Sequence, residues 1–289
     1  MKIVDCFNWF LSDIEKELPN FKHQGFDVVQ LPPIQYCKPG NEWYKLFQNY
    51  DIQTIGNRLG TEEDWIRVNY SAHALGLKTC TCIQLRHVAG MDNGVARPHE
   101  LVPQKIAKFY KGIDEYRDDK NRHHVTEGNW GLPRLDYENE ELIFSEYIPF
   151  LDKIFEYSDY ARLDEGKHIG LPSEGYKIWS ILYQRYGHKI IAECINERED
   201  ILNEYAKYCW VLTEEGIACP KGTVRFVESH DTYLNDWGYT RNLTDDHILN
   251  LFEKCCKNHH NVIFYLRPFN DTWRSRRMYN ILHSDKNKC

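Results

Sequence analysis

The stretch from Tyr160 to Glu193, YARLDEGKHIGLPSEGYKIWSILYQRYGHKIIAE, contains the pattern that decides the fold. It begins with the short apolar run Tyr160–Leu163, continues through the helix-length segment Glu174–Tyr186, and ends with a second apolar run, Lys189–Glu193. Short apolar runs that alternate with helix-length segments are typical of parallel strands covered by helices. The stretch therefore predicts a strand, a helix and a second, parallel strand.

The same alternation extends along the whole chain of 289 residues. The strand-like runs are Ile3–Phe7, Phe26–Leu31, Thr79–Leu85, Tyr160–Leu163, Lys189–Glu193, Trp210–Thr213, Val224–Glu228 and Val262–Leu266. The helix-length segments include Ser12–Lys22, Glu62–Leu75, Glu138–Tyr157, Glu174–Tyr186 and Asp245–Lys257. Eight strand candidates favour a closed (β/α)₈ TIM barrel over an open doubly wound sheet, and no Gly-rich phosphate loop follows the first run. We therefore expect residues 1–289 to form one barrel domain.

Two serines and two glycines mark expected helix ends. Ser12 and Ser173 are candidate N-caps, because a serine side chain can accept a hydrogen bond from the first turn. Gly76 and Gly187 are candidate stops, because glycine readily adopts the left-handed conformation that ends a helix.

Residues 86–135, which follow the third strand-like run, are expected to leave the barrel as a small inserted subdomain. The stretch is polar and irregular, with glycine and proline at Gly90, Pro98, Gly112 and Pro133, among other positions. A connection of this length inside a compact domain usually has a functional role.

Composition argues against several other classes of protein. The formal net charge of −7 gives no reason to expect a nucleic-acid partner. No stretch approaches the roughly 18–20 apolar residues of a membrane span, and the first residues lack the apolar run of a signal peptide. We therefore expect no membrane association and a cytoplasmic location, in which the 10 cysteines are reduced. Their spacing includes no CxxC pair, which argues against a structural metal, and the oligomeric state stays open.

Polar side chains stand where four of the apolar runs end. Asp164 follows the fourth run, Glu193 closes the fifth, and His87 follows the third. His230 and Asp231 follow the seventh. Active sites of (β/α)₈ barrels lie at the carboxyl ends of the strands, so we expect these side chains to meet in one pocket.

Two carboxylates at the mouth of a barrel suit the hydrolysis of glycosidic bonds. One acts as nucleophile and the other as proton donor, and a separation of about 5–5.5 Å gives retention of configuration. Arg162 lies two residues before Asp164 on the same strand, so its guanidinium is expected to face Asp164 and keep it ionised. Glu193 has no adjacent cation in the sequence, so we expect burial to keep it protonated as the acid.

Four segments around these residues resemble the active-site regions of the α-amylase family, glycoside hydrolase family 13, and the resemblance covers nearly the whole chain. They are Leu85-Arg-His87, Arg162-Leu-Asp-Glu-Gly-Lys-His168, Ile191-Ala-Glu193 and Phe226-Val-Glu-Ser-His-Asp231. The resemblance implies Asp164 as nucleophile, Glu193 as acid/base and Asp231 as the carboxylate that stabilises the transition state. It implies substrate-binding roles for the following residues: His87, Arg162, Lys167, His168 and His230.

The chain departs from the family pattern at the calcium site that the resemblance implies. The family usually has an asparagine, which normally binds calcium, where this chain has Arg86; it also usually has an aspartate where this chain has Cys82. The family's Leu-Pro-Asp-Leu motif reads Leu132-Pro-Arg-Leu135 here, with Arg134 at the aspartate position. Calcium needs hard oxygen ligands, and a guanidinium offers only donors. We therefore predict no metal and no cofactor, and an arginine–carboxylate network that uses Asp136 or Glu165 instead.

The chain is also shorter than the family's barrels. Helix six is expected to be missing or vestigial, because Glu214–Gly222 leaves room for little more than a turn. The eighth helix is expected to be short, at about Ser275–His283, and no C-terminal β-sandwich is expected. For the aromatic platform that the family places at the cleavage subsite, the candidates are Phe47 and Tyr50.

The resemblance makes a retaining hydrolase of α-1,4-linked glucans the leading hypothesis, with an α-glucan or maltooligosaccharide as substrate and a covalent glycosyl-enzyme as intermediate. The Lys167–His168 pair favours α-1,4 over 1,6 bonds. A transglycosylase that uses the same site stays open, and so does a catalytically weak carbohydrate-binding barrel. Three facing carboxylates repel one another, which is costly in a barrel without catalytic use for them.

Overall fold

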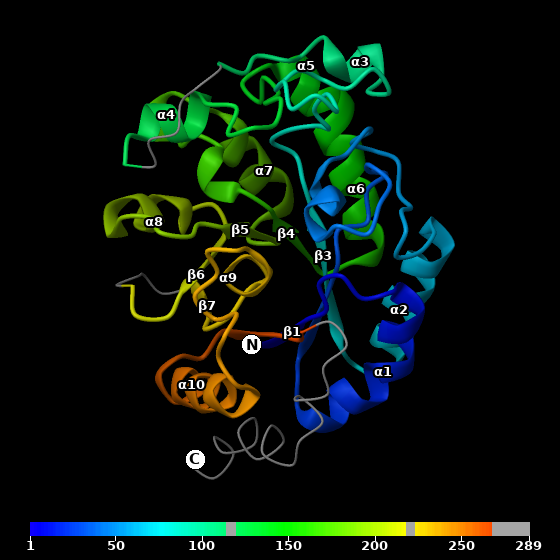
Figure 1. Ribbon diagram of the computed structural model, residues 1–289, viewed down its shortest axis with the longest axis vertical. Helices are drawn as coiled ribbons and strands as arrows, with labels where there is room; N and C mark the ends of the chain where they lie inside the picture. Colours follow the sequence, from blue (N-terminus) through cyan, green and yellow to red (C-terminus); the bar gives the residue numbers. More distant parts are fainter. Residues whose placement is uncertain (114–119, 218–222, 268–289) are drawn as a thin grey trace.

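Eight parallel strands close into a barrel in the computed structural model, which describes residues 1–113, 120–217 and 223–267 (Figure 1). The strands are β1 Lys2–Asp5, β2 Val28–Leu31, β3 Lys78–Ile83, β4 Tyr160–Leu163, β5 Ile190–Glu193, β6 Trp210–Glu214, β7 Thr223–Phe226 and β8 Val262–Tyr265. Each strand pairs with the next one along the chain, and β8 pairs with β1 through Phe264 and Val4. The predicted (β/α)₈ barrel is confirmed, and each predicted run overlaps one of the strands.

The strands are apolar on both faces because both faces are buried. One set of side chains fills the barrel interior, and it includes Ile3, Val28, Ile191, Leu212, Val224, Phe226 and Ile263. Neighbouring side chains point the opposite way, since direction alternates along a strand. They join the larger core under the helices, as Val4, Val29 and Ala192 do. Burial on both faces explains why the runs in the sequence are continuously apolar.

Helices surround the barrel and form most of its outer layer (Figure 1). The longer ones are α1 Leu11–Gln24, α2 Glu62–Ala74, α6 Ile148–Tyr157, α7 Ile178–Tyr186, α8 Glu199–Tyr205 and α10 Asp245–Asn258. The predicted helix over Glu138–Tyr157 consists of α5 Glu140–Leu142, the π-helical turn η2 Ile143–Tyr147 and α6. The residue Pro149 at the start of α6 lacks a backbone N–H, which accounts for the change in hydrogen-bond register.

The predicted helix ends were half right. Ser12 is not an N-cap, because α1 begins at Leu11 after Phe10, whose side chain makes no capping bond. Ser173 is also not one, because it lies inside the 3₁₀ turn η4 Pro172–Glu174, before α7 begins. Gly187 ends α7 and Gly76 follows the last turn of α2, both with positive φ, as predicted.

The stretch 86–135 leaves the barrel after β3 and returns beside its own starting point. The backbone N–H of Leu135 donates to the carbonyl of Arg86 at 2.9 Å. The short helices α3 Gln104–Ala107 and α4 Arg122–Glu127 lie in it, on the side of the molecule away from α1 and α10 (Figure 1). The stretch thus begins and ends at neighbouring points of the fold, and its status as an inserted subdomain stays a prediction.

The connection between β6 and β7 is as short as the sequence indicates. Only residues 215–222 join the two strands, and 215–217 contain no helix. The remainder of the proposed site of helix six, the expected eighth helix Ser275–His283 and any segment beyond it lie outside the described residues. None of the described helices has the length and apolar character needed to cross a membrane.

Candidate active site

The barrel brings the predicted acids together at the carboxyl ends of its strands. Asp164 directly follows β4 and Glu193 is the last residue of β5. Asp231 lies in the short helix α9 His230–Leu234, which follows β7 and begins at a capping box formed by Ser229 and Thr232. One carboxylate oxygen each of Asp164 and Glu193 and a ring nitrogen of His230 lie within 4.8 Å of one another. The two carboxylates are therefore close enough to act on the same bond.

Arg162 lies between the two carboxylates and contacts both. Its Nη1 donates to Oδ1 of Asp164 at 2.5 Å, and its Nη2 donates to Oε1 of Glu193. Glu193, which has no adjacent cation in the sequence, therefore has one in the structure. Sequence adjacency gave no sign of the pair, because β4 and β5 are neighbours only in the barrel, where Arg162 is in register with Ile191.

The expected ionisation of Asp164 also needs correction. Burial raises the pKa of Asp164 well above its ordinary value, and the nearby negative charge of Glu193 acts in the same direction. The guanidinium of Arg162 lowers that pKa but does not cancel the cost of burial. Burial likewise raises the pKa of Asp231, which accepts a hydrogen bond from Nδ2 of Asn235 at 3.0 Å.

Gln84, near the end of β3, is a site residue that sequence reasoning missed. Its Nε2 donates to Oδ2 of Asp164 at 2.8 Å and lies 3.0 Å from Nε2 of His87. The side chain of Gln35 holds the backbone of Gln84 through two hydrogen bonds, at 2.7 and 3.0 Å. A glutamine inside the apolar run Thr79–Leu85 was the available signal.

The three predicted substrate-binding histidines are buried, and their imidazoles are uncharged at neutral pH. Burial lowers the pKa of His87 to about 4 and those of His168 and His230 to about 3. The Nδ1 of His168 is 2.8 Å from the carbonyl of Val125 in α4. A neutral imidazole can donate one hydrogen bond and accept another, which suits a sugar hydroxyl.

A cavity of about 550 Å³ opens beside the acids. It is lined by Glu165, Lys167, His168, Glu193, Ile195, Asn196, Glu214, Asp231, Thr232, Trp237 and Tyr239. Asp164 and Arg162 lie deeper, with exposed fractions of 5% and 2%. Two large aromatic side chains at the rim, Trp237 and Tyr239, are 68% and 60% exposed. The cavity therefore combines polar and charged lining side chains with two aromatic rings that are exposed to solvent.

Aromatic side chains also cover the inner end of the site. Phe7 stacks on His230 with ring centroids 4.3 Å apart and on Phe47 at 5.5 Å. The Cζ of Arg162 lies 5.9 Å from the centre of the Phe47 ring. Tyr50, the other candidate platform, packs instead against Tyr36 and His99. Phe47 is therefore the candidate that lies at the acids.

Arginines and carboxylates occupy the region where the family resemblance implies calcium. Nη1 of Arg86 lies 3.1 Å from Oε2 of Glu165, and Nη2 of Arg134 lies 3.3 Å from Oε1 of Glu127. Burial by itself would raise the pKa of Glu165, but the charge of Arg86 lowers it to about 2. Two buried guanidinium groups do not fit a calcium ion, because they supply no oxygen ligand.

The predicted arginine–carboxylate network is thus present. Of the two alternative carboxylates, Glu165 takes part, whereas Asp136 pairs with Lys111 at 3.2 Å. Glu127 is the partner of Arg134, and sequence reasoning missed it. It lies in α4, inside an irregular stretch whose path the sequence does not reveal.

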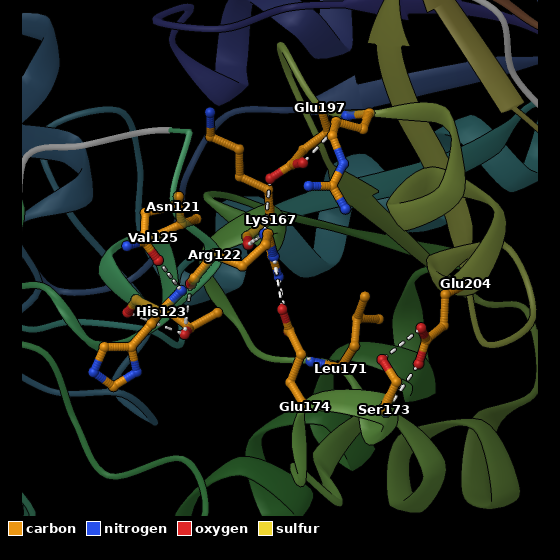
Figure 2. A network of polar contacts seen from close by, with 12 residues as sticks. Asn121, Arg122, His123, Val125, Lys167, Leu171, Ser173, Glu174, Glu197 and Glu204 are labelled. Carbon is orange, nitrogen blue, oxygen red and sulfur yellow. Dashed lines mark hydrogen bonds and ion pairs between the residues drawn. The ribbon is translucent and has the colours of Figure 1, made fainter.

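Arg122 ties α4 to the loops that follow β4 and β5 (Figure 2). Its Nε and Nη2 donate to the two carboxylate oxygens of Glu174 at 2.8 and 3.0 Å. Its Nη1 donates to Glu197 at 2.7 Å and to the carbonyl of Lys167 at 2.8 Å. The Nζ of Lys167 in turn donates to the carbonyl of Ile195 at 2.9 Å. The subdomain therefore fixes the loop that carries Lys167 and His168.

The fold and the arrangement of acids place the chain among (β/α)₈ barrels with a carboxylate-lined mouth, and comparison with known proteins narrows this class. No family model matches the chain. It is 28% identical over 187 residues to an α-amylase from Clostridium acetobutylicum, a match that covers 62% of this chain and 24% of that protein. The chain thus spans about a quarter of the length of this curated relative.

Solved structures show the same likeness in fold. The α-amylase from Geobacillus thermoleovorans, solved in complex with acarbose, superposes with a TM-score of 0.75 at 17% identity. That match covers 97% of this chain and 76% of the other. A cyclomaltodextrin glucanotransferase superposes with a TM-score of 0.69 at 14% identity, and the match covers 94% of this chain and 70% of the other. The resemblance to the α-amylase family that the four sequence segments indicate is confirmed.

Proposed function

We propose that the protein is a retaining glycoside hydrolase that acts on α-1,4-linked glucans through a covalent glycosyl-enzyme. The observation that carries the proposal is the approach of Asp164 and Glu193: one carboxylate oxygen of each lies within 4.8 Å of the other, and Glu193 lines the cavity. Retaining enzymes place their two carboxyl groups about 5–5.5 Å apart, whereas inverting enzymes leave room for a water molecule between them.

In the proposed first step, an oxygen of Asp164 attacks the anomeric carbon while Glu193 donates a proton to the departing sugar oxygen. In the second step, Glu193 removes a proton from water, which attacks the same carbon and releases Asp164. Glu193 lines the cavity, so it can reach a leaving group there. Asp231 lines the same cavity and stabilises the positive charge of the transition state in this proposal.

Arg162 has two duties in this scheme. Its contact with Asp164 holds the nucleophile in place and favours its ionised form. Its contact with Glu193 must weaken when Glu193 carries the proton, because a neutral carboxyl attracts a guanidinium less strongly than a carboxylate does. Protonation of Glu193 and the strength of its contact with Arg162 are therefore coupled in this proposal.

Lys167 and His168 are proposed to bind the leaving-group sugar, and His87 and His230 the sugar at the cleavage point. Lys167 and His168 line the cavity, and His230 lies within 4.8 Å of the two acids. The complex of a similarly folded α-amylase with acarbose supports an oligosaccharide substrate. We further propose that the activity is independent of calcium, because Arg86 and Arg134 occupy the implied ion site with their own carboxylate partners.

A transglycosylase is the second candidate, and the exposed rings of Trp237 and Tyr239 favour it. Both line the cavity together with Lys167, which is proposed to bind the leaving-group sugar, the position that an acceptor sugar would occupy. Stacking on flat rings would hold such an acceptor in place of water. One of the similarly folded proteins is a glucanotransferase, which also supports this candidate.

Incubation with maltooligosaccharides of several defined lengths tests these functions. Products that are only shorter than the substrate indicate hydrolysis, and products that are also longer indicate transfer. Proton NMR of the first-formed products reports their anomeric configuration, and retention is expected. Loss of products in Glu193→Gln assigns the activity to this site. A wild-type protein that binds the sugars without converting them would instead be a carbohydrate-binding barrel.

A further inference from the structure

A second group of potential ligands lies on the outside of the barrel, at the short connection after β6. Glu215 is the first residue beyond β6, and Cys255 and His259 belong to the last turn and the C-cap of α10. A spacing of four residues places Cys255 and His259 on the same face of the helix. One ligand atom from each of the three residues lies within 4.8 Å of the other two.

The carboxylate of Glu215 contacts both other members of the group. The Nε2 of His259 approaches its Oε2 to 2.7 Å, and the thiol of Cys255 interacts with the same carboxylate. The Oε2 atom is buried from solvent, and its approach to His259 lacks hydrogen-bond geometry. Ligand atoms that converge in this way can share a cation once the thiol and the imidazole have released their protons.

We propose that Glu215, Cys255 and His259 form a Zn²⁺ site that fastens α10 to the chain leaving β6. Thiolate, imidazole and carboxylate are the three ligand types that zinc takes in proteins, at about 2.0–2.3 Å. The thiolate disfavours calcium and magnesium, which take oxygen ligands. Side-chain movements of roughly 1 Å bring the three atoms to those distances, and water completes a tetrahedral shell.

Access and charge agree with a bound zinc ion. The side chains of Glu215 and His259 are 31% and 29% exposed, so an ion can enter, whereas Cys255 is buried. A thiolate and a carboxylate neutralise the two charges of zinc. The guanidinium of Arg225 lies nearby, and its Nη1 donates to the carbonyl of Glu214 at 2.7 Å. This hydrogen bond directs the guanidinium toward Glu214 and away from the three ligand atoms.

The position explains what such a site would do. Only residues 215–222 connect β6 to β7, so a zinc ion would supply a contact between the start of this short connection and α10. The preceding residue, Glu214, lines the candidate active-site cavity and accepts from the backbone N–H of Asn196 at 3.2 Å. The spacing of cysteines in the sequence gives no signal for this site, because the group contains a single cysteine.

Titration of chelator-treated protein with ZnCl₂ and then with CoCl₂ tests the proposal. We expect one equivalent of zinc by calorimetry. We also expect a thiolate-to-cobalt charge-transfer band in the near ultraviolet, which only a sulfur ligand produces. Cys255→Ser should remove that band, and His259→Gln should weaken binding by roughly tenfold or more. Cys256→Ser changes the adjacent cysteine, which lies outside the group, and serves as the matched control.

Two results would overturn the proposal. One is the absence of stoichiometric zinc binding to the folded wild-type protein. The other is binding that survives His259→Gln and Cys255→Ser but is lost in Glu193→Gln, which would place the ion at the acids of the barrel mouth. His259 is partly exposed, so His259→Gln is expected to fold even if Cys255→Ser does not.

Discussion

Gln84 donates a hydrogen bond from its Nε2 to Oδ2 of Asp164 at 2.8 Å. Arg162 donates a hydrogen bond to the other oxygen, Oδ1. Gln84 and Arg162 thus each donate to one carboxylate oxygen of Asp164. A hydrogen bond to a charged group contributes about 1.5–3 kcal/mol. Gln84→Leu removes the donor at similar volume, so we expect kcat/KM to fall roughly 10- to 100-fold.

The matched control for Gln84 is Gln53→Leu, because Gln53 donates to Glu146 and to the carbonyl of Ser145 and not to a carboxylate of the site. Its kcat/KM should stay close to wild type. The acid limb of the pH profile should also move to higher pH in Gln84→Leu, since the ionised form of Asp164 loses a donor. An unchanged acid limb together with a lower melting temperature would mean that Gln84 has only a structural role.

The pH dependence of the activity should reflect the burial of Asp164. Its raised pKa means that the carboxyl is protonated, and unable to attack, at pH values where an ordinary aspartate is ionised. As pH falls through that raised pKa, kcat/KM should decline, with an acid limb well above the ordinary value of about 3.9. Profiles with an aryl maltoside, whose leaving group needs no proton, isolate this limb in the wild-type protein. A wild-type limb near pH 4 would contradict the prediction. Glu193→Gln should move the limb to lower pH, because the negative charge of Glu193 contributes to the raised pKa.

Removal of the Arg122 side chain should loosen the leaving-group side of the site. In Arg122→Ala, the carboxylates of Glu174 and Glu197 lose their shared cation and the carbonyl of Lys167 loses a donor (Figure 2). Breaking a fully buried ion pair costs about 3–5 kcal/mol, and Arg122 and Glu174 are partly exposed, so the free energy of unfolding should fall by less than that. KM for long substrates should rise more than kcat falls.

Arg185→Ala is the control for Arg122, because Arg185 pairs with Asp152 on the surface, where such pairs contribute little. Thermal denaturation and steady-state kinetics on both variants provide the measurement. Arg122→Lys should recover part of the stability but not the paired contact with Glu174. Equal effects of Arg122→Ala and Arg185→Ala would refute a positioning role for Arg122.

Calcium should have no effect on the stability or activity of the protein. Arg86 and Arg134 place positive charge in the region where the family resemblance implies the ion, and Glu165 and Glu127 already pair with them. Calorimetric titration with CaCl₂ should show no saturable heat, and treatment with EGTA should leave the melting temperature unchanged. Tight binding of one calcium ion would falsify this prediction. EGTA is preferred because EDTA would also remove zinc from the proposed site on α10.

The sequence predicts the barrel and the converging acids for one physical reason. Strands buried on both faces are continuously apolar, so a polar side chain at the end of a run, such as Asp164 or Glu193, is conspicuous. Contacts between neighbouring strands leave no such signal. The pair of Arg162 and Glu193 depends on the register of β4 against β5, which a single sequence does not reveal. The partners in residues 86–135, Arg122 and Glu127, follow no periodic pattern and were missed for that reason.

Trp237 should control whether a sugar or water receives the glycosyl group. Its ring is 68% exposed and lines the cavity next to Asp231, so it can stack on a sugar bound beyond the cleavage point. Trp237→Ala should lower the ratio of transfer to hydrolysis several-fold, since a lost stacking contact of about 0.5–1.5 kcal/mol weakens acceptor binding but not water attack. Trp237→Phe should retain most of the ratio.

The control for Trp237 is Phe144→Ala, which removes an exposed ring outside the cavity lining. The measurement is the ratio of lengthened to shortened maltooligosaccharides at several acceptor concentrations. The ratio in Trp237→Ala should approach wild type as the acceptor concentration rises, because mass action compensates for weaker binding. A ratio that stays low at saturating acceptor, or one unchanged from wild type throughout, would show that Trp237 does not bind the acceptor.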